Sequence, residues 1–297
     1  MLSKEAIATE FQNIQKEICE GLEACDGAAT FVNDDWQHAT GGGGSSRLIT
    51  HGNVFEKGGV NFSAVQGTMP SFMKEKVSSD ATTFFATGVS IVMHPQSPMV
   101  PIIHMNIRYF ETDAGDAWFG GGIDLTPVYV DKEQATQFHR TLKQVCDMYL
   151  EGSYAQFKQQ ADDYFFIKHR NETRGIGGIF FDYLRHNTTV PFENTFQFVC
   201  DVGRSFLAAY TPIVDVNRNL HYGEKQKQWQ LLRRGRYVEF NLVYDRGTRF
   251  GLETGGRTES ILMSLPEQAS WLYNHKVAAD SDEAATLGFL KKGFNWL

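Results

Sequence analysis

Long apolar stretches and paired cysteines are both missing from this chain of 297 residues. No apolar run approaches the ~18–20 residues that a helix needs to cross a bilayer, so we expect no membrane span. The start of the chain is polar and helix-patterned, with no signal-peptide core. Its four cysteines include no Cys-x-x-Cys pair and are too few for a disulfide framework in a chain of this length. The sequence therefore predicts a protein of a reducing compartment.

Positive charge is also scarce. Lys plus Arg number 28 against 35 Asp plus Glu, and the formal net charge is −7. An acidic chain lacks the basic face that a phosphate backbone requires, so we expect no nucleic-acid partner. The chain contains no dinucleotide fingerprint, no phosphate-binding loop and no Gly-x-Ser-x-Gly elbow. Nothing therefore indicates a nicotinamide, flavin, nucleotide or serine-hydrolase site.

The composition is that of a globular chain, with 42% hydrophobic residues. There is no internal repeat and no Pro-rich linker, so we expect a single domain over residues 1–297. Apolar residues at helical spacing predict a first helix over about 3–26, ended by Gly27. Short strands and turns are expected over 31–67. Longer strands are predicted over 84–94, 102–111 and 118–125.

Helices dominate the rest of the chain. They are predicted to begin at Asp131, to run over about 154–169, and to extend from Phe192 to Tyr210. The remaining expectations are a short helix over 224–234, a strand over 236–244, Asp245–Gly247 as a turn into another strand, and helices over about 267–275 and 282–292. Blocks of strands followed by blocks of helices favour an α+β fold with an antiparallel sheet.

Five polar residues fall on one predicted face of two neighbouring strands. Residues two apart on a strand share a face, so His104, Asn106 and Arg108 lie together. Ser90 and His94 likewise share a face of the preceding strand. If the two strands pair, one surface carries all five groups. Such a surface is too polar for a core and needs a ligand or water. A solvated sheet face is the alternative.

Asp124 follows three consecutive glycines in the next predicted strand. Gly120–Gly122 lack side chains, which allows a ligand to approach the backbone or the strand to bulge. The carboxylate is then suited to accept hydrogen bonds from N–H donors of a ligand. A plain turn aspartate is the alternative.

Arginines gather towards the C-terminus, at Arg236, Arg246, Arg249 and Arg257. Clustered guanidinium groups favour a polycarboxylate or phosphate ligand, because each can pair in a bidentate manner. Surface ion pairs are the alternative, and we prefer that interpretation for Arg249.

Four histidines are candidate metal ligands: His94, His104, His139 and His169. Imidazoles suit Zn, Cu, Fe or Mn. Their spacing matches no local metal motif, and a histidine at a helix end, such as His169, has a plain electrostatic explanation. The sequence leaves the presence of a divalent metal cation open.

Eight long motifs run through the chain: Gly58–Ser63, Ser90–Glu111, Trp118–Pro127, Phe138–Leu142, Asp163–Arg170, Arg174–Asp182, Arg233–Leu242 and Tyr244–Pro266. In these motifs and their order the sequence resembles the oxygen-dependent coproporphyrinogen III oxidase family. Two positions depart from the family pattern. Ser97 stands where the family turn has Asn, and Ile103 stands where it has Thr.

The resemblance implies a reaction and an assembly. The substrate is coproporphyrinogen III and the co-substrate is molecular oxygen. Two propionate groups are oxidatively decarboxylated to vinyl groups, giving protoporphyrinogen IX in haem biosynthesis. The resemblance also implies a large antiparallel sheet flanked by α-helices on both sides. It further implies a cytoplasmic homodimer with its contact within residues 237–272.

The resemblance assigns roles to individual residues as well. The family's proton donor corresponds to His104, and Asp124 and Arg108 complete the implied catalytic set. The implied substrate-binding residues are Ser90, Asn106, Ile107, Arg108, Gly255, Gly256 and Arg257. A divalent cation is implied at His94, His104, His139 and His169, although an electron-rich porphyrinogen is able to react with O₂ without a metal.

Two other functions stay open at this point. One is a metal-dependent oxygenase or hydrolase of another substrate, built on the same histidines. The other is a carrier of tetrapyrroles or polycarboxylates without catalytic activity.

Overall fold

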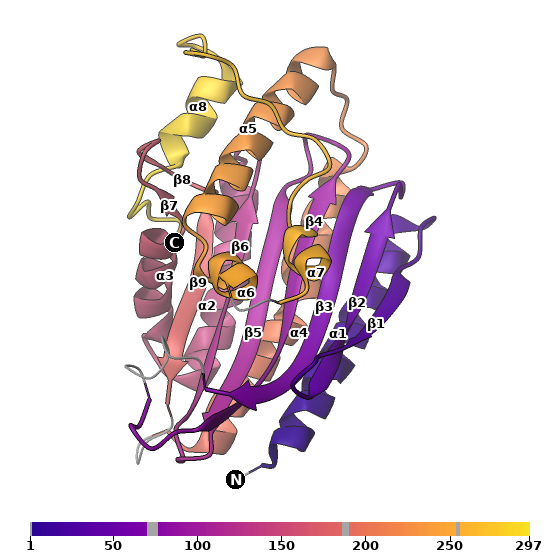
Figure 1. Ribbon diagram of the computed structural model, residues 1–297. Helices are drawn as coiled ribbons and strands as arrows, with labels where there is room; N and C mark the ends of the chain where they lie inside the picture. The colour runs from indigo at the N-terminus through magenta and orange to yellow at the C-terminus, as the bar shows by residue number, and fades with distance from the viewer. Residues whose placement is uncertain (1, 70–76, 186–189, 254–255) are drawn as a thin grey trace.

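Seven strands of the computed structural model form one antiparallel sheet, in the order β1-β2-β3-β4-β5-β6-β9 (Figure 1). The structure describes residues 2–69, 77–185, 190–253 and 256–297. The strands are β1 (Val32–Gln37), β2 (Gly42–Thr50), β3 (Phe55–Thr68), β4 (Thr83–Pro95), β5 (Ile102–Thr112), β6 (Ala117–Thr126) and β9 (Gly177–Leu184). A small hairpin pairs β7 (Phe166–Ile167) with β8 (Glu172–Thr173). The predicted antiparallel α+β fold is confirmed.

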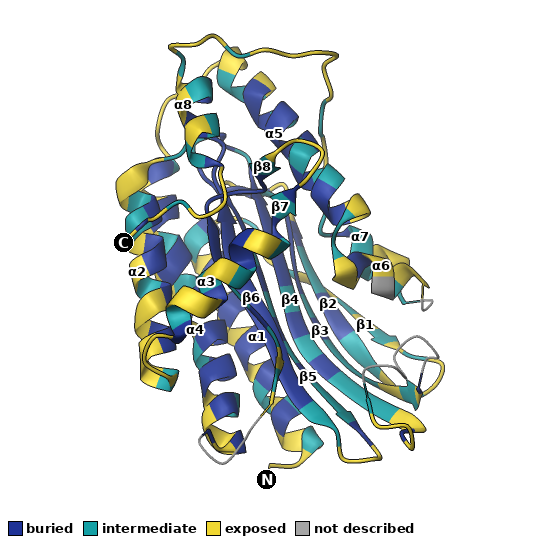
Figure 2. Cartoon of the chain, turned by 90° about the vertical axis from the view of Figure 1, so that its left-hand side faces the viewer, coloured by how far each residue is buried: buried dark blue, intermediate teal, exposed yellow. Residues whose placement is uncertain are grey.

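Helices cover both faces of this sheet, as Figure 2 shows from the side. One face carries α1 (Lys4–Asp26), α2 (Lys132–Tyr149) and α4 (Phe192–Asn217). The other carries α5 (Glu224–Val243), α6 (Arg246–Glu253) and α7 (Thr258–Leu262). The remaining helices are α3 (Ser153–Tyr164), which packs beside β9, and α8 (Asp282–Phe289), near α5. Among the described helices, none combines the length and the apolar character that a membrane span needs.

Alternating residues of β5 explain why the two faces of the sheet differ. The odd-numbered residues from Ile103 to Tyr109 are buried in the main apolar core, beneath α4. The even-numbered residues from His104 to Phe110 are only partly buried and lie on the opposite face. Burying a large apolar side chain stabilises the fold by about 1.5–3 kcal/mol. A one-residue slip of the strand would expose the whole apolar set, so the core fixes which residues face the other side.

The first helix follows its predicted pattern closely. Ile7, Phe11 and Ile14 are fully buried, and the helical spacing places them on one stripe against the sheet and α4. The Ser3 hydroxyl accepts a hydrogen bond from the backbone N–H of Ala6, which caps the start of the helix. At the other end Gly27 adopts φ 79°, a left-handed conformation that glycine takes at little cost.

The prediction of a strand over 236–244 is wrong, because this segment belongs to α5. The helix predicted over 224–234 is only the first half of that element. Alternating apolar residues suggested a strand, but Tyr237 and Phe240 are buried while Leu242 is 47% exposed. Burial therefore follows helical spacing. Packing of the helix over the partly buried face of the sheet overrides the local preference for a strand.

The expected turn at Asp245–Gly247 does not lead into a strand either. It begins α6, since a carboxylate oxygen of Asp245 accepts a hydrogen bond from the Thr248 N–H at 2.7 Å. Aspartate at this position strongly favours the start of a helix, because its carboxylate accepts a hydrogen bond from a free backbone N–H of the first turn. The local residues were compatible with a turn, but they cap a helix instead.

Two other helix predictions need correction and one is confirmed. The segment 267–275 is irregular, and it lies along α5, where the Ser270 N–H donates to the carbonyl of Leu231. The helix predicted over 154–169 ends at Tyr164, because the β7–β8 hairpin follows. The helix predicted over 282–292 is present as α8, although it is shorter.

Candidate functional site

The sheet register brings the predicted polar residues together on the face covered by α5, α6 and α7. Directly paired residues form a row across all seven strands: Asp34, Ser46, Asn61, Ser90, Asn106, Gly122 and Phe180. Ser90 lies opposite Asn106, as the predicted pairing of the two strands requires. His104 lies opposite Asp124 in a neighbouring row, and Arg108 follows on the same face of β5. We call this surface the polar face.

The carboxylate of Asp124 is the most enclosed charge on the polar face, with 1% exposure. The Arg174 Nη2 donates to both of its oxygens, at 2.6 and 2.8 Å, and the Arg174 Nε lies 3.2 Å from Oδ2. The His104 Nδ1 lies 2.8 Å from Oδ1. An ionised carboxylate only accepts hydrogen bonds, so the His104 proton in this contact is on Nδ1. The His104 Nε2 is then left for a ligand.

Asp124 and Arg174 keep each other charged. Burial raises the pKa of the Asp124 carboxyl, but the Arg174 charge and the His104 hydrogen bond outweigh this effect, and the pKa is lowered overall. Burial likewise lowers the pKa of Arg174, which is 2% exposed, and the Asp124 charge more than reverses that. The two side chains therefore form an ionised pair where an isolated charge would be very unfavourable.

Aromatic rings and α5 hold the Arg174 guanidinium in place. Its central carbon lies 4.4 Å from the ring centre of Phe165, 4.8 Å from that of Tyr237 and 4.7 Å from that of Phe240. The Nη1 donates to Asn241 Oδ1 at 2.9 Å. A cation close to an aromatic face is stabilised by the ring electrons. Three of these four residues are on α5, so this helix positions the arginine over the sheet.

Two more arginines share one carboxylate on the more exposed part of the polar face. The Arg108 Nη2 lies 2.9 Å from Asp182 Oδ1, and the Arg246 Nη2 lies 3.9 Å from Asp182 Oδ2. Arg108 also donates to Asn106 Oδ1 at 2.8 Å. Both guanidinium groups lie near the Phe180 ring, at 6.0 and 5.7 Å. Two cations beside one carboxylate leave positive charge available for a ligand carboxylate.

The glycines of β6 provide room for these groups. A Cβ at position 120 would lie 2.6 Å from the Arg108 Nε, so Gly120 lets that side chain extend across the strand. The strand continues through the three glycines, with a register shift against β9 between Phe119 and Gly121. Asp124 therefore lies within a strand, and the alternative of a turn aspartate is wrong.

Other predicted binding residues lie apart from this group. Arg257 forms an ion pair with Asp34 on β1, and four strand spacings, about 19 Å, separate β1 from β5. The Gly256 N–H donates to the Gly251 carbonyl of α6 at 2.8 Å, and Gly255 lies outside the described residues. The Ile107 side chain is fully buried on the opposite face, and its backbone lies within the ladder between β4 and β6. The structure therefore does not bring these residues beside His104.

Two of the histidines predicted as metal ligands, His94 and His139, are buried, and each forms hydrogen bonds with its own separate partners. The His94 Nε2 lies 2.9 Å from the carbonyl oxygen of Ser264. His139, on α2, lies between the Tyr154 hydroxyl at 2.8 Å and the Ile176 carbonyl at 3.0 Å. Burial lowers the pKa of both imidazoles to about 3. Both are therefore neutral side chains bound to hydroxyl and backbone groups.

The other two histidines, His169 and His104, likewise have different partners from each other and from the first two. His169 is bound by Glu239 at 2.7 Å and by the Tyr244 hydroxyl at 2.8 Å, whereas His104 is bound by Asp124. Within the part of the chain that the structure describes, no three His, Cys, Asp or Glu side chains are arranged to hold a metal ion. The predicted four-histidine set therefore does not fit a single divalent cation.

The remaining arginines of the predicted cluster also divide among separate contacts. Arg249 lies 3.6 Å from Glu253 at the surface, as the preferred ion-pair interpretation requires. Arg236 contacts Glu239 at 3.0 Å and Glu172 at 3.9 Å. The run of arginines in the sequence is therefore not one binding site.

Sequence reasoning missed Arg174 and Asp182 as members of the site. Both lie at the ends of one motif, Arg174–Asp182, which otherwise served only to establish the resemblance. The sequence did contain a signal for Arg174, because this arginine comes directly before a glycine-rich, apolar segment. A charged side chain in such a buried setting needs a partner of opposite charge.

The fold and the polar face define an enzyme-type site: a buried carboxylate orients a histidine beside cationic groups on an antiparallel sheet. Such an arrangement suits proton transfer on a ligand that carries carboxylates. A family model described as coproporphyrinogen III oxidase matches residues 6–296. The chain therefore belongs to the coproporphyrinogen III oxidase family, which acts in porphyrin biosynthesis. The resemblance found in the sequence is confirmed.

Replacing Arg174 with Met tests whether the buried pair depends on charge. The variant leaves Asp124 without its cation, and we expect the free energy of unfolding to fall by about 3–5 kcal/mol at pH 7. The Asp124 pKa is lowered in the parent, so the pair stabilises the fold above the ordinary aspartate pKa and less as pH falls. An unpaired buried Asp124 has its pKa raised above the ordinary value of about 4, so the deficit should shrink as pH falls, beginning above pH 4 and continuing below it.

Urea denaturation at several pH values measures this deficit. The double variant Arg174→Met/Asp124→Asn is the control, because it removes the unpaired charge and should recover most of the loss. Equal losses in the single and double variants would contradict the charge explanation. They would show that Arg174 acts through packing against its aromatic neighbours.

Proposed function

We propose that this protein is an oxygen-dependent coproporphyrinogen III oxidase. It converts two propionate groups of coproporphyrinogen III to vinyl groups and gives protoporphyrinogen IX. Each conversion releases one CO₂ and two hydrogens. O₂ accepts the four hydrogens lost over both steps. Membership of the family supports the substrate, and the oxygen requirement is our extension from the resemblance of the long motifs.

The observation that carries the proposal is the contact of His104 with the ionised Asp124–Arg174 pair, on the same face of β5 as Arg108. A bond from Nδ1 to a carboxylate fixes the histidine tautomer and presents Nε2 as the group that exchanges a proton. The His104 side chain is 21% exposed, which leaves it accessible to a ligand. The arrangement therefore offers one oriented proton-transfer group beside cations that suit propionates.

Asp124 acts through His104 in this proposal. Both of its oxygens are already bonded and it is 1% exposed, which disfavours direct bonds to pyrrole N–H groups. Its charge orients the imidazole and stabilises positive charge that develops on the oxidised pyrrole.

Arg108 and Arg246 hold a propionate by exchanging it for part of their contact with Asp182. Holding the propionate there places the reacting carbon near His104.

Turnover in air is the direct test. Protein incubated with coproporphyrinogen III should yield a product lighter by two CO₂ and four hydrogens, detected by mass spectrometry, without added nicotinamide or flavin. Strict anaerobiosis should stop the reaction. Full anaerobic turnover would contradict the oxygen requirement. Tight binding of the substrate without any product in air would favour a carrier instead.

Replacing Asp124 with Asn separates orientation from binding. The amide keeps the shape but loses the charge that holds the His104 tautomer and balances Arg174, so thermal melting first checks that the variant is folded. We expect kcat to fall by about 10²-fold or more while KM changes little, since the interaction acts mainly in the transition state. Steady-state kinetics beside the control variant Asp201→Asn, a partly exposed aspartate on α4, provide the measurement. A raised KM with intact kcat would show that Asp124 only supports binding.

We also propose that the protein works as a cytoplasmic homodimer with its contact within residues 237–272. Four free cysteines fit a reducing compartment. Five large apolar side chains in this range are exposed by 42–56%: Leu242, Val243, Leu252, Trp271 and Leu272. A gathering of exposed apolar residues is typical of a protein contact.

Sedimentation velocity tests the dimer. We expect a dimer for the parent and a shift towards monomer for Leu242→Lys/Val243→Lys, because two charges replace apolar contact area. Leu220→Lys is the matched control, since Leu220 is 46% exposed but lies outside the proposed contact. A parent that is monomeric at all concentrations would contradict the proposal.

A further inference from the structure

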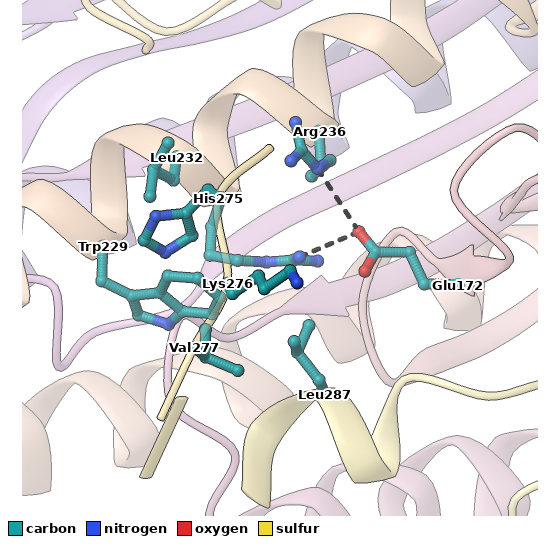
Figure 3. A pocket seen from close by; sticks show the side chains of 9 residues that line it. Glu172, Trp229, Leu232, Arg236, His275, Lys276, Val277 and Leu287 are labelled. Carbon is teal, nitrogen blue, oxygen red and sulfur yellow. Dashed lines mark hydrogen bonds and ion pairs between the residues drawn. The ribbon is translucent and has the colours of Figure 1, made fainter. Parts of the chain in front are cut away.

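A second candidate site is a pocket of about 420 Å³ between α5, α8 and residues 275–277 (Figure 3). None of its lining residues belongs to the polar face of the sheet. Its volume lies within the range of about 300–1,000 Å³ that is usual for small-molecule sites. The pocket is therefore a separate place where a ligand can bind.

One side of the pocket carries an excess of positive charge. Arg233, Arg236 and Lys276 line it together with a single carboxylate, that of Glu172. The Arg233 Nη1 lies 2.8 Å from Glu172 Oε1, and the Arg236 Nε lies 3.9 Å from the same oxygen, as the dashed lines of Figure 3 mark. In the described part of the chain, Lys276 forms no ion pair with an acidic side chain. Among the lining residues, one carboxylate thus faces three cations, and outside the lining Glu239 binds Arg236 at 3.0 Å.

Arg233 gives the second observation that points to a ligand. It is 4% exposed, and its Nε and Nη2 have no hydrogen-bond partner among the described residues. A buried donor without a partner is unfavourable, and more so on a charged group. An oxygen of a bound anion supplies the missing acceptor. Burial and the charges of Arg170 and Arg233 also lower the pKa of Arg236, which Glu239 opposes. A bound anion reduces the electrostatic repulsion between these arginines.

Apolar side chains form much of the rest of the pocket, beginning at Trp229, whose ring centre lies 5.6 Å from the central guanidinium carbon of Arg233. Trp229 is 6% exposed, and its indole N–H is already bonded to the Val128 carbonyl at 2.9 Å, so it offers mainly a ring surface. Leu232, Val277 and Leu287 complete this apolar part. The pocket therefore combines an anion-binding end with an apolar wall, which suits an amphipathic molecule better than an inorganic ion.

We propose that this pocket binds a small organic anion. Its carboxylate or phosphate group lies at Arg233, Arg236 and Lys276, and its apolar body lies against Trp229. The binding competes with Glu172 for the two arginines. This assignment does not depend on the oxidase activity, because it uses neither the polar face nor its ligand.

Isothermal titration calorimetry of the full-length protein tests the assignment with three probes of similar size. Benzoate carries a carboxylate, phenyl phosphate carries a phosphate, and benzyl alcohol is neutral. We expect saturable binding of at least one anion and none of the alcohol. The stronger of the two anions identifies the preferred head group.

Variants locate the binding. Lys276→Met should weaken the bound anion about two- to fivefold, since Lys276 is exposed. Arg236→Gln should weaken it about tenfold or more, because it removes a charged donor from a half-buried place. Lys291→Met, an exposed lysine outside the pocket, and Arg108→Lys, on the polar face, should leave the affinity unchanged. Thermal melting checks that each variant is folded.

Two results would overturn the proposal. One is the absence of saturable binding of either anion to the parent. The other is binding that Arg108→Lys weakens while both pocket variants leave it unchanged, since the anion then occupies the polar face instead.

Discussion

The buried ion pair of Asp124 and Arg174 is the interaction on which the arrangement of the site depends. Neither charge is tolerable alone at this depth, so each must be present for the other to remain ionised. Arg174 is in turn held by Asn241 and by two aromatic rings of α5. The pair therefore joins β6 to the helix that covers it. It also sets the orientation of His104, whose Nδ1 has Asp124 as its partner.

Alternation along β5 made much of the polar face predictable. The core residues from Ile103 to Tyr109 are buried on one side, which forces His104, Asn106 and Arg108 to the other. The pairing of Ser90 with Asn106 follows from the same pattern in β4 and a short proline-rich connection. These features are local, because a period of two and a tight connection define both the face and the register.

Other parts of the site depend on contacts between distant segments and could not be derived in this way. Arg174 meets Asp124 across 50 positions of the chain and Asn241 across 67. The alternating apolar residues in the second half of α5 predicted a strand. The sequence alone does not show that this segment packs over the sheet, and this packing makes it a helix. The histidines failed as a metal set for a related reason. Imidazole suits a metal, a backbone carbonyl or a tyrosine hydroxyl equally well, and only the fold determined that His94 and His139 have the latter partners.

Charge balance on the polar face favours a ligand with several carboxylates. The chain as a whole has a net charge of −7, yet Arg108, Arg246 and Arg257 all lie over this sheet, each beside an aspartate. A ligand carboxylate that replaces one of these aspartates exchanges one ion pair for another, so the gain in free energy at each position is small. Several such exchanges at fixed separations instead determine where the ligand lies. The contacts on this face therefore contribute more to positioning than to affinity, which is what the proposed proton transfer at His104 requires.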